Sequence, residues 1–310
     1  MGPISRTSLA LALVPLLSYA ANDKLQTATF RSASDVVLIP ATVLDAHNHL
    51  VRGLSARDFR LLEDKIEQPI RYFGEEELPL SLAVVFDTSG SMAGKISYLR
   101  AALANVLATA NPRDEFCLIA FADHPELAVP WTTDPGAIES AVFSRPARGR
   151  TALLDAMQAG LAALKSSHNP RRAMVAFTDG GDNFSRISPR GFSSLLVEAD
   201  AQLYAIDSAG FTSVVQSTGE DFESPNLLSD LCDRAGGRYF QVSGAKESLA
   251  VADQIGKELR SQYVLGYVPA AHSDAGKFHR VRVEVLRHPG QSRLSVFWRH
   301  GYRAPSDSIR

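Results

Sequence analysis

The stretch Leu82–Lys95, which reads LAVVFDTSGSMAGK, decides the fold of this chain. Its first five residues are all apolar, and Asp87 follows them directly. An unbroken apolar run of this length is typical of a strand covered on both faces, as in a parallel sheet between layers of helices. Asp87 and the two hydroxyls of Ser89 and Ser91 are therefore expected at the carboxyl end of that strand. Ligands of open α/β sheets bind at this end.

The size, charge and cysteine content of the chain limit what it can do. It has 310 residues, 45% of them hydrophobic, which is enough for one large domain or two of ordinary size. Its formal net charge is −2 and its pI is about 6.5. Because binding to a phosphate backbone needs a positive surface, we expect no nucleic-acid partner. Cys117 and Cys232 lie in apolar patterns, which favours two buried thiols over a disulfide.

Residues 1–20 have the pattern of a secretory signal peptide. Arg6 precedes an apolar run from Leu9 to Leu17, and Ser18-Tyr19-Ala20 fits a small-x-small cleavage site. An uncleaved anchor is the alternative interpretation. Because no other segment approaches the ~20 apolar residues of a membrane span, we expect a secreted, periplasmic or cell-envelope protein with no further span.

Three regions of the chain differ in their hydrophobic pattern. Residues 28–76 and 263–304 contain short strand-like stretches such as DVVLIPATVLD and FHRVRVEVLR, so both are expected to be β-rich. Residues 80–262 alternate apolar runs with helical patterns, which predicts a doubly wound, mostly parallel α/β sheet. Since neither β-rich region is large enough to be stable alone, we expect them to form one small β-sandwich into which the α/β domain is inserted.

The individual elements of the α/β domain follow from periodicity. Apolar residues at helical spacing predict helices over 96–110 and 151–164, each with one face on the sheet. Further helices are expected near 192–198, 225–234 and 245–261. The turn FADHPE between EFCLIAF and ELAVPW predicts one antiparallel strand at an edge of the sheet.

Oxygen-bearing side chains are predicted to converge at one edge of this sheet. The first strand delivers Asp87, Ser89 and Ser91, Thr151 lies at a helix start, and Asp179 ends the strand RAMVAFTD. In the common strand order 3-2-1-4-5-6, the first and fourth strands are neighbours at the topological switch point, where a crevice opens. Hydroxyl and carboxylate oxygens suit a hard cation such as Mg²⁺.

The motifs DTSGS, Thr151 and TDGGD resemble the von Willebrand factor A-type domain with its metal-ion-dependent adhesion site, over about residues 80–242. The flanking motifs LSARDF, YVLGY and RHGYR resemble bacterial secreted proteins built around a related domain. The resemblance implies that Mg²⁺, Mn²⁺ or Ca²⁺ is held by Asp87, Ser89, Ser91, Thr151 and Asp179. It also implies that a partner protein completes the coordination with a Glu or Asp carboxylate. The chain is then a metal-dependent, adhesion-type protein-binding module and not an enzyme.

The rim of the site is expected to contact the partner. We place on it Met92, Arg148, Arg150, Asp182 and Phe211. The two arginines favour acidic partners, although solvated loop charges would look the same. Residues 208–224 are long for a loop between a strand and a helix, and we interpret Glu220, Asp221 and Glu223 as a solvated acidic stretch.

The same residues allow several other interpretations. Asp and Ser at strand ends also make turns, and Thr151 could be a helix N-cap. A phosphatase of the haloacid-dehalogenase type needs a second aspartate where Ser89 stands. His47 and His49 fit a turn better than the metal pair of a barrel enzyme, and the serine-hydrolase elbow is missing from the sequence. The main rival is a structural or assembly component of the cell envelope that needs no metal.

Overall fold

The computed structural model of the chain describes residues 36–75, 78–211, 226–269, 276–286 and 293–304. The expected signal peptide over residues 1–20 and the acidic residues Glu220, Asp221 and Glu223 lie outside these ranges. Within them, no helix combines the length and apolar character needed to cross a membrane.

A six-stranded sheet is built around β5 (Leu80–Asp87), whose eight residues are all buried. The other strands are β6 (Glu115–Phe121), β7 (Pro125–Thr132), β8 (Arg171–Thr178), β9 (Gln202–Asp207) and β10 (Tyr239–Gln241). Their order is β10-β9-β8-β5-β6-β7, and β7 at the edge is the only antiparallel one of the six. This confirms the predicted doubly wound sheet, with the switch point between β5 and β8.

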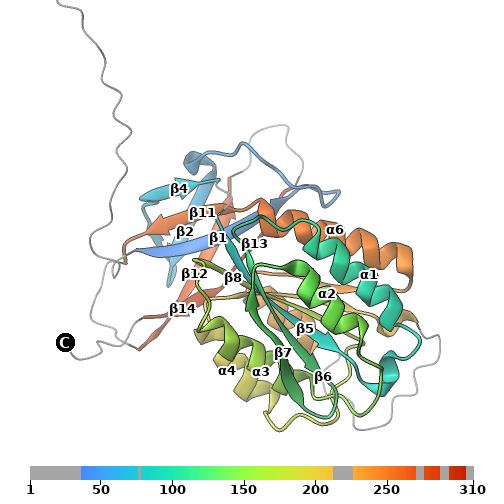
Figure 1. The fold of residues 1–310 in the computed structure, drawn as a ribbon. Coiled ribbons are helices and arrows are strands. Elements are labelled where there is room, and N and C mark those ends of the chain that lie inside the picture. The colour runs from blue at the N-terminus through green and yellow to red at the C-terminus, as the bar shows by residue number, and fades with distance from the viewer. Residues whose placement is uncertain (1–35, 76–77, 212–225, 270–275, 287–292, 305–310) are drawn as a thin grey trace, which may run out of the picture. The chain divides into compact units, whose positions relative to one another are not determined.

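Helices cover both faces of the sheet (Figure 1). They are α1 (Ile96–Leu107), α2 (Pro135–Phe143), α3 (Leu153–Leu164), α4 (Pro189–Glu198), α5 (Leu227–Arg234) and α6 (Ala245–Arg260). Because side chains alternate along a strand, Val84 and Phe86 pack with α1, α2 and α6, whereas Ala83 and Val85 pack with α3, α4 and α5. The described residues also form three short 3₁₀ turns: η1 (Ala56–Asp58), η2 (Gly90–Met92) and η3 (Ala209–Phe211).

Helix α2 was not expected from the sequence. It begins at Pro135, and the carboxylate of Asp134 caps it by accepting a hydrogen bond from the Gly136 N–H at 2.9 Å. Only Ile138 and Val142 of this helix are buried, so its apolar stripe is too narrow to be recognised by periodicity. The other five helices lie where periodicity predicts them.

Two antiparallel sheets form the β-sandwich. The first has the order β13-β1-β11-β4 and the second β14-β12-β2-β3. Their strands are β1 (Val37–Leu44), β2 (Phe59–Glu63), β3 (Ile66–Gln68), β4 (Tyr72–Gly74), β11 (Tyr263–Tyr267), β12 (Phe278–Val285), β13 (Ser295–Trp298) and β14 (Gly301–Arg303). Each sheet combines strands from both ends of the described chain, and their inner faces share one apolar core. The expected insertion of the α/β layers into a sandwich is therefore confirmed.

Buried polar side chains join the sandwich strands to the α/β layers. Gln262, which directly precedes β11, donates to the side chains of Gln202 at 2.9 Å and Thr42 at 3.3 Å. Arg171, the first residue of β8, donates to the Gln262 side-chain oxygen at 2.7 Å. These groups lie at the end of the sheet opposite the carboxyl ends of β5 and β8.

Two smaller predictions are also confirmed. Cys117 and Cys232 are buried free thiols, and burial raises both pKa values above the ordinary range. His47 and His49 lie in a turn after β1, where both backbone N–H groups donate to the Asp45 carboxylate. These bonds confirm the turn predicted for this segment.

Candidate metal centre

The centre of the candidate site is Asp87, the last residue of β5, which is completely buried. Its neighbour strand β8 ends at Thr178, whose hydroxyl donates to Asp87 Oδ2 at 3.0 Å. The other carboxylate oxygen, Oδ1, accepts the backbone N–H of Ser89 at 2.8 Å. These two bonds fix the orientation of the carboxylate and the start of the following loop.

The two serine hydroxyls predicted as ligands lie together. Ser89 Oγ and Ser91 Oγ are 3.1 Å apart, with Ser89 fully buried and Ser91 exposed. The short 3₁₀ turn η2 folds the chain back after Ser89 and so brings the second hydroxyl next to the first. The alternating serines of the motif therefore point to one place.

Thr151 is held beside this loop by backbone hydrogen bonds. The Gly90 N–H donates to the Gly149 carbonyl at 3.0 Å, and the Arg148 N–H to the Thr88 carbonyl at 2.7 Å. Thr151 is only 4% exposed, yet its hydroxyl forms no hydrogen bond with any residue that the structure describes. A hydroxyl that no neighbouring residue engages is open to a ligand at this position.

The interpretation of Thr151 as a helix N-cap is wrong. The N-cap of α3 is Ala152, and the capping oxygen comes from Asp182, whose Oδ2 accepts the Leu154 N–H at 2.9 Å. Thr151 is instead positioned by Asn183: its N–H donates to the Asn183 side-chain oxygen, and its carbonyl accepts the Asn183 N–H, both at 3.0 Å. The hydroxyl of Thr151 is thus left available.

Asp179 follows β8 and is held in a tight turn. The next residue, Gly180, has a φ of +81°, and a Cβ at this position would lie 2.6 Å from Asp207 Oδ2. A residue with a side chain would be both strained and blocked here. Asp179 Oδ2 is 3.0 Å from Nζ of Lys95, and the two side chains are only 7% and 10% exposed.

Two carboxylates of the site, Asp87 and Asp207, have raised pKa values. Burial and, second, repulsion by Asp179 raise the pKa of Asp87 to about 7. Burial also raises the pKa of Asp207, at the end of β9, and Asp179 adds to this effect. The Tyr239 hydroxyl, which donates to Asp207 Oδ2 at 2.5 Å, and the Lys95 ammonium oppose it. A bound cation would relieve this unfavourable clustering of buried carboxylates.

Three residues near the site were missed by sequence reasoning. Lys95 stands in GSMAGK and could have been noticed as a charged residue one helical turn beyond Ser91. Asp207 ends YAID, so it shares the strand-end position of Asp87 and Asp179. Nothing in the local pattern marks Asn183, because its partner Thr151 is 32 residues away.

Two of the expected rim residues are corrected. Met92 is 0% exposed and belongs to the core cluster that contains α1, because the 3₁₀ turn directs it inward. Asp182 is 8% exposed, and both of its carboxylate oxygens accept backbone N–H groups. It is a structural cap. Arg148 and Arg150 are exposed beside the site, as expected, and Phe211 ends η3, where its side chain lies outside the description.

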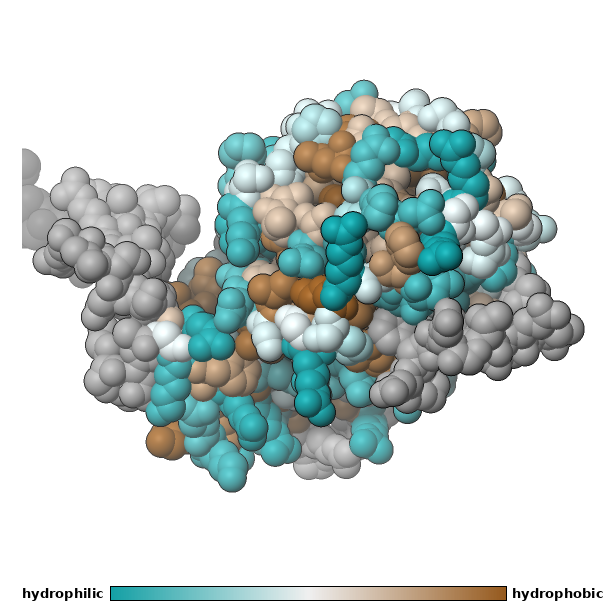
Figure 2. Space-filling model, turned by 90° about the horizontal axis from the view of Figure 1, so that it is seen from below, coloured by the Kyte–Doolittle hydropathy of each residue, from teal (hydrophilic) through white to brown (hydrophobic). Residues whose placement is uncertain are grey.

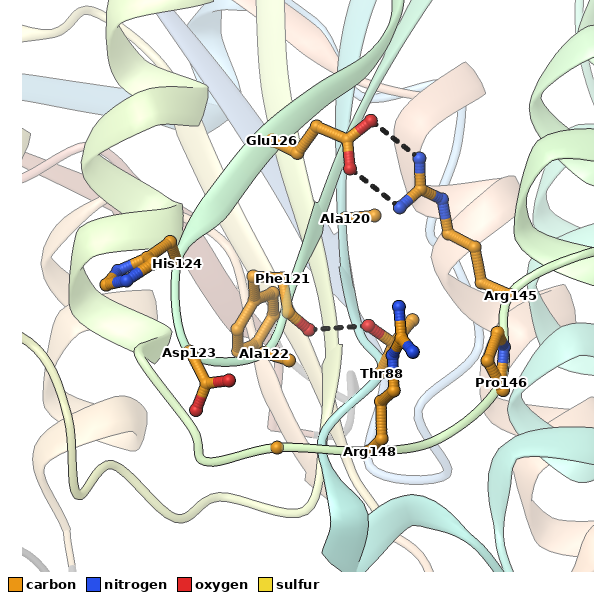
Figure 3. A pocket seen from close by; sticks show the side chains of 11 residues that line it. Thr88, Ala120, Phe121, Ala122, Asp123, His124, Glu126, Arg145, Pro146 and Arg148 are labelled. Atoms are coloured by element: carbon orange, nitrogen blue, oxygen red, sulfur yellow. Dashed lines mark hydrogen bonds and ion pairs between the residues drawn. The ribbon is translucent and has the colours of Figure 1, made fainter.

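A cavity of about 420 Å³ adjoins the metal-site loop (Figure 3). Its walls are the turn between β6 and β7 and the segment before Thr151. Glu126 and Arg145 form a double hydrogen bond in it, each 2.8 Å long. Arg148 extends toward Thr88 and has no acidic partner among the described residues. The cavity therefore offers a free positive charge close to the candidate ligands.

The donor set fits a hard divalent cation. No group of three or more His, Cys, Asp or Glu side chains able to hold a metal occurs in the described part of the chain. The candidate set contains two carboxylates and three hydroxyls, so hydroxyl oxygens make up most of it. Such neutral oxygen ligands suit Mg²⁺ or Ca²⁺ and are poor ligands for softer ions.

Comparison with known proteins finds a family match for the part of the chain that carries the candidate ligands. Residues 82–181 match the family model of the von Willebrand factor type A domain. The matched segment begins in β5 and ends just after Asp179, so it contains all five candidate ligands. The chain contains a von Willebrand factor A-type domain.

Individual relatives are distant. The magnesium-chelatase 67 kDa subunit of Chlorobaculum parvum is 27% identical over 190 residues, which are 57% of this chain and 30% of that subunit. This chain therefore spans less than a third of the relative's length. Among solved structures, the von Willebrand factor type A protein from Catenulispora acidiphila is 12% identical, with a TM-score of 0.51 over 90% of this chain and 76% of its own. The PilB minor pilin of Streptococcus sanguinis is 15% identical, with a TM-score of 0.46 over 62% and 63%.

These likenesses differ in what they establish. At 12% identity, the Catenulispora structure shows a shared fold and nothing about ligands. The likeness covers 90% of this chain, which is more than the α/β layers make up, so it includes strands of the sandwich. The function of the von Willebrand factor A-type domain in this chain therefore has to be argued from its own residues.

Proposed function

We propose that this chain is a protein-binding module whose binding depends on a divalent metal ion, with residues 80–262 as the binding unit. Asp87, Ser89, Ser91, Thr151 and Asp179 would hold Mg²⁺, or Mn²⁺ or Ca²⁺ in its place. A Glu or Asp carboxylate of the partner protein would complete the coordination. When bound, the ion supplies an electrophilic centre that attracts an anionic ligand.

One observation carries this proposal. Thr151 is 4% exposed and lies beside the serine loop, and its hydroxyl has no hydrogen-bond partner among the described residues. Asp182 and Asn183 form the hydrogen bonds that a structural role would require of Thr151. The threonine is therefore positioned for its oxygen alone, which is what a metal ligand needs.

The exposed arginines beside the site, Arg148 and Arg150, favour a polar contact with an acidic partner. On the face seen from below (Figure 2), hydrophilic residues lie among several hydrophobic groups. Such a surface favours a contact made by charged and polar groups over a broad apolar one. The free guanidinium of Arg148 in the adjoining cavity would attract residues that flank the partner's metal-binding carboxylate.

The proposed setting is outside the cytoplasm, in the cell envelope or secreted, because the N-terminal residues have the pattern of a signal peptide. The alternative is a structural or assembly component that uses the same fold without a metal. The unpartnered Thr151 hydroxyl favours the metal-dependent function, since Asn183 and Asp182 already make the local hydrogen bonds of a structural role.

Thermal unfolding of the mature chain with Mg²⁺, with Mn²⁺ and with chelator tests the metal site. A site saturated at about 100 times its dissociation constant adds about 2.7 kcal/mol of stability. We expect Asp87→Ala to remove this stabilisation, because Asp87 both orients the serine loop and supplies a central carboxylate. Thr151→Val, which removes one hydroxyl and keeps the shape, is expected to weaken it without lowering stability in chelator.

The outcome separates the two functions. Stabilisation by Mg²⁺ in the wild type that is absent in Asp87→Ala supports the metal site and justifies a search for partners with and without chelator. If the melting temperature of each of the three proteins is the same with Mg²⁺, with Mn²⁺ and with chelator, the structural alternative becomes the better account. Asp87→Ala must retain the far-UV circular dichroism of the wild type for the comparison to count.

A further inference from the structure

A buried lysine lies inside the candidate metal centre. Lys95 immediately precedes α1 and is 8% exposed. Its ammonium is 3.0 Å from Oδ2 of Asp179, one of the five candidate metal ligands. Removing a lysine charge from water is unfavourable unless a carboxylate compensates it, so the pair indicates a specific electrostatic role.

A second carboxylate lies close to the one that pairs with Lys95. A Cβ on Gly180, the residue after Asp179, would lie 2.6 Å from Asp207 Oδ2, so the Asp207 carboxylate is next to this turn. Lys95 is therefore part of the same electrostatic cluster as the candidate ligands. An ion at the site would interact with the same Asp179 carboxylate that Lys95 already neutralises.

We propose that Lys95 is a resident counter-cation of the metal centre: it lowers the affinity of the site for the divalent ion and makes the loaded site more positive by one charge. This inference rests on the proposed metal-binding function. It adds to that function a reason why the loaded site requires an anionic partner, and it names the residue responsible.

The charge balance gives the physical reason. When ionised, Asp87 and Asp179 together with Lys95 carry one net negative charge. A divalent ion makes this set positive by one charge, because the three candidate hydroxyl ligands are neutral. Asp207, which is not a candidate ligand, lies next to this set, and its charge is the same with or without Lys95. Removing Lys95 therefore lowers the charge of the loaded site by one unit and weakens its attraction for an external carboxylate.

The test compares Mg²⁺ binding by the full mature chain and its Lys95→Met variant, using isothermal titration calorimetry. Methionine keeps an unbranched side chain of similar length and removes the charge. We expect Lys95→Met to bind Mg²⁺ about tenfold more tightly or better, since a nearby positive charge is removed. We also expect it to melt at a lower temperature than the wild type in chelator, because Asp179 is left without its partner.

Two controls make this result specific. Lys257→Met removes the same charge from an exposed pair with Asp253 on α6, whose atoms are 2.6 Å apart, and should leave Mg²⁺ affinity unchanged. Lys95→Arg keeps the charge and should stay close to the wild type in Mg²⁺ affinity. Lys95→Gln provides a second neutral variant if Lys95→Met does not fold.

A second measurement tests the requirement for an anion. With Mg²⁺ saturating, a short blocked peptide that contains one glutamate is titrated into each protein and followed by NMR at the amides of the serine loop. The wild type should bind it more tightly than Lys95→Met does, although the variant holds the metal better. This opposite ordering of the two affinities is the signature of a counter-cation.

Each outcome has a definite meaning. If the wild type binds Mg²⁺ and Lys95→Met binds it equally or more weakly, Lys95 is a structural residue and the inference is overturned, while the proposed function stands. Equal peptide binding by the two loaded proteins overturns the part about the anionic ligand. If neither the wild type nor a Lys95 variant binds Mg²⁺, the metal-dependent function fails and this inference with it.

Discussion

At the scale of single residues, side chains of the same type have different tasks around the candidate metal centre. Asp87 ends β5 and Asp179 follows the neighbouring strand β8, whereas Asp182, three residues beyond Asp179, caps a helix. The difference comes from the backbone N–H groups that each carboxylate meets. A carboxylate that accepts several backbone hydrogen bonds has few lone pairs left for a metal.

Removing the Asp182 cap should affect both stability and metal binding. We expect Asp182→Ala to lower the free energy of unfolding by about 1 kcal/mol or more, the usual cost of a lost N-cap. It should also reduce the Mg²⁺-dependent rise in melting temperature, because the capped turn carries Asn183, which positions Thr151. Urea unfolding in chelator and thermal melts with Mg²⁺ measure the two effects.

Ser188 provides a matched control. It caps α4 by accepting the Gly191 N–H at 3.1 Å, and its surroundings are exposed. Ser188→Ala should cost a similar amount of stability and leave the response to Mg²⁺ unchanged. An equal loss of that response in both variants would mean that general destabilisation, and not the positioning of Thr151, is being measured.

The sequence predicts those residues whose role depends on local pattern. Asp87, Ser89 and Ser91 could be placed because a buried strand leads directly into them. Asp182 and Met92 could not, since their exposure depends on contacts with distant segments: the carboxylate of Asp182 is bonded by Leu154, 28 residues earlier in the chain. The pairing of Lys95 with Asp179 spans 84 residues and leaves no periodic signal.

At the scale of elements, α6 is fixed by buried charge. Glu258 in this helix is 0% exposed and accepts hydrogen bonds from Arg238 at 2.6 Å and Gln254 at 3.0 Å. Burial raises the pKa of Glu258, and the attraction of Arg238 only partly opposes this. The helix also approaches α1 closely, because a Cβ on Gly256 would lie 2.5 Å from the Thr109 side chain.

The raised pKa of Glu258 predicts how stability changes with pH. The folded protein holds a proton on this group more tightly than the unfolded chain, so the contribution of Glu258 is full below its ordinary pKa of 4.5. It is lost as the pH rises through the higher pKa of the folded state. We therefore expect the stability of the wild type relative to Glu258→Gln to fall as the pH is raised from about 4.5.

Urea unfolding of both proteins between pH 4.5 and pH 8 measures this difference, starting at the ordinary pKa of a glutamate. If the wild type instead becomes more stable relative to Glu258→Gln as the pH rises, the ion pair between Glu258 and Arg238 outweighs the cost of burying the charge. Glu247→Gln serves as the control of opposite sign. The Ser243 N–H and hydroxyl lower the pKa of this exposed glutamate, so its contribution is present at high pH and lost on acidification.

At the scale of the whole molecule, the sandwich depends on both ends of the described chain. Leu61 from β2 and Val283 from β12 pack in one core and pair directly in register. β1 likewise pairs with β11 and with β13. The periodicity of each β-rich region predicts strands. That the two regions pair with each other could be inferred only because each is too small to be stable alone. The register of the pairing could not be predicted.

A chain that ends at Arg260 tests this dependence. It retains the α/β layers and β1 to β4 but lacks β11 to β14, so the apolar faces of β1 and β2 lose their partners. We expect limited proteolysis with mass spectrometry to show rapid cleavage within residues 36–75 and slow cleavage of residues 80–260. Equal protection of both parts would mean that the N-terminal strands fold without the C-terminal ones.

The pairing of β4 with β11 determines how a mechanical load would pass through the molecule. β4 leads into the α/β layers, β11 leads out of them, and the two are antiparallel neighbours in which Gly74 pairs with Val264. A pull exerted on the metal centre by a tethered partner would reach both strands at the same end and draw them in the same direction. The hydrogen bonds between the two strands would carry little of the force. Because β4 is at the edge of this sheet, the load within the sheet would fall instead on the hydrogen bonds between β11 and β1.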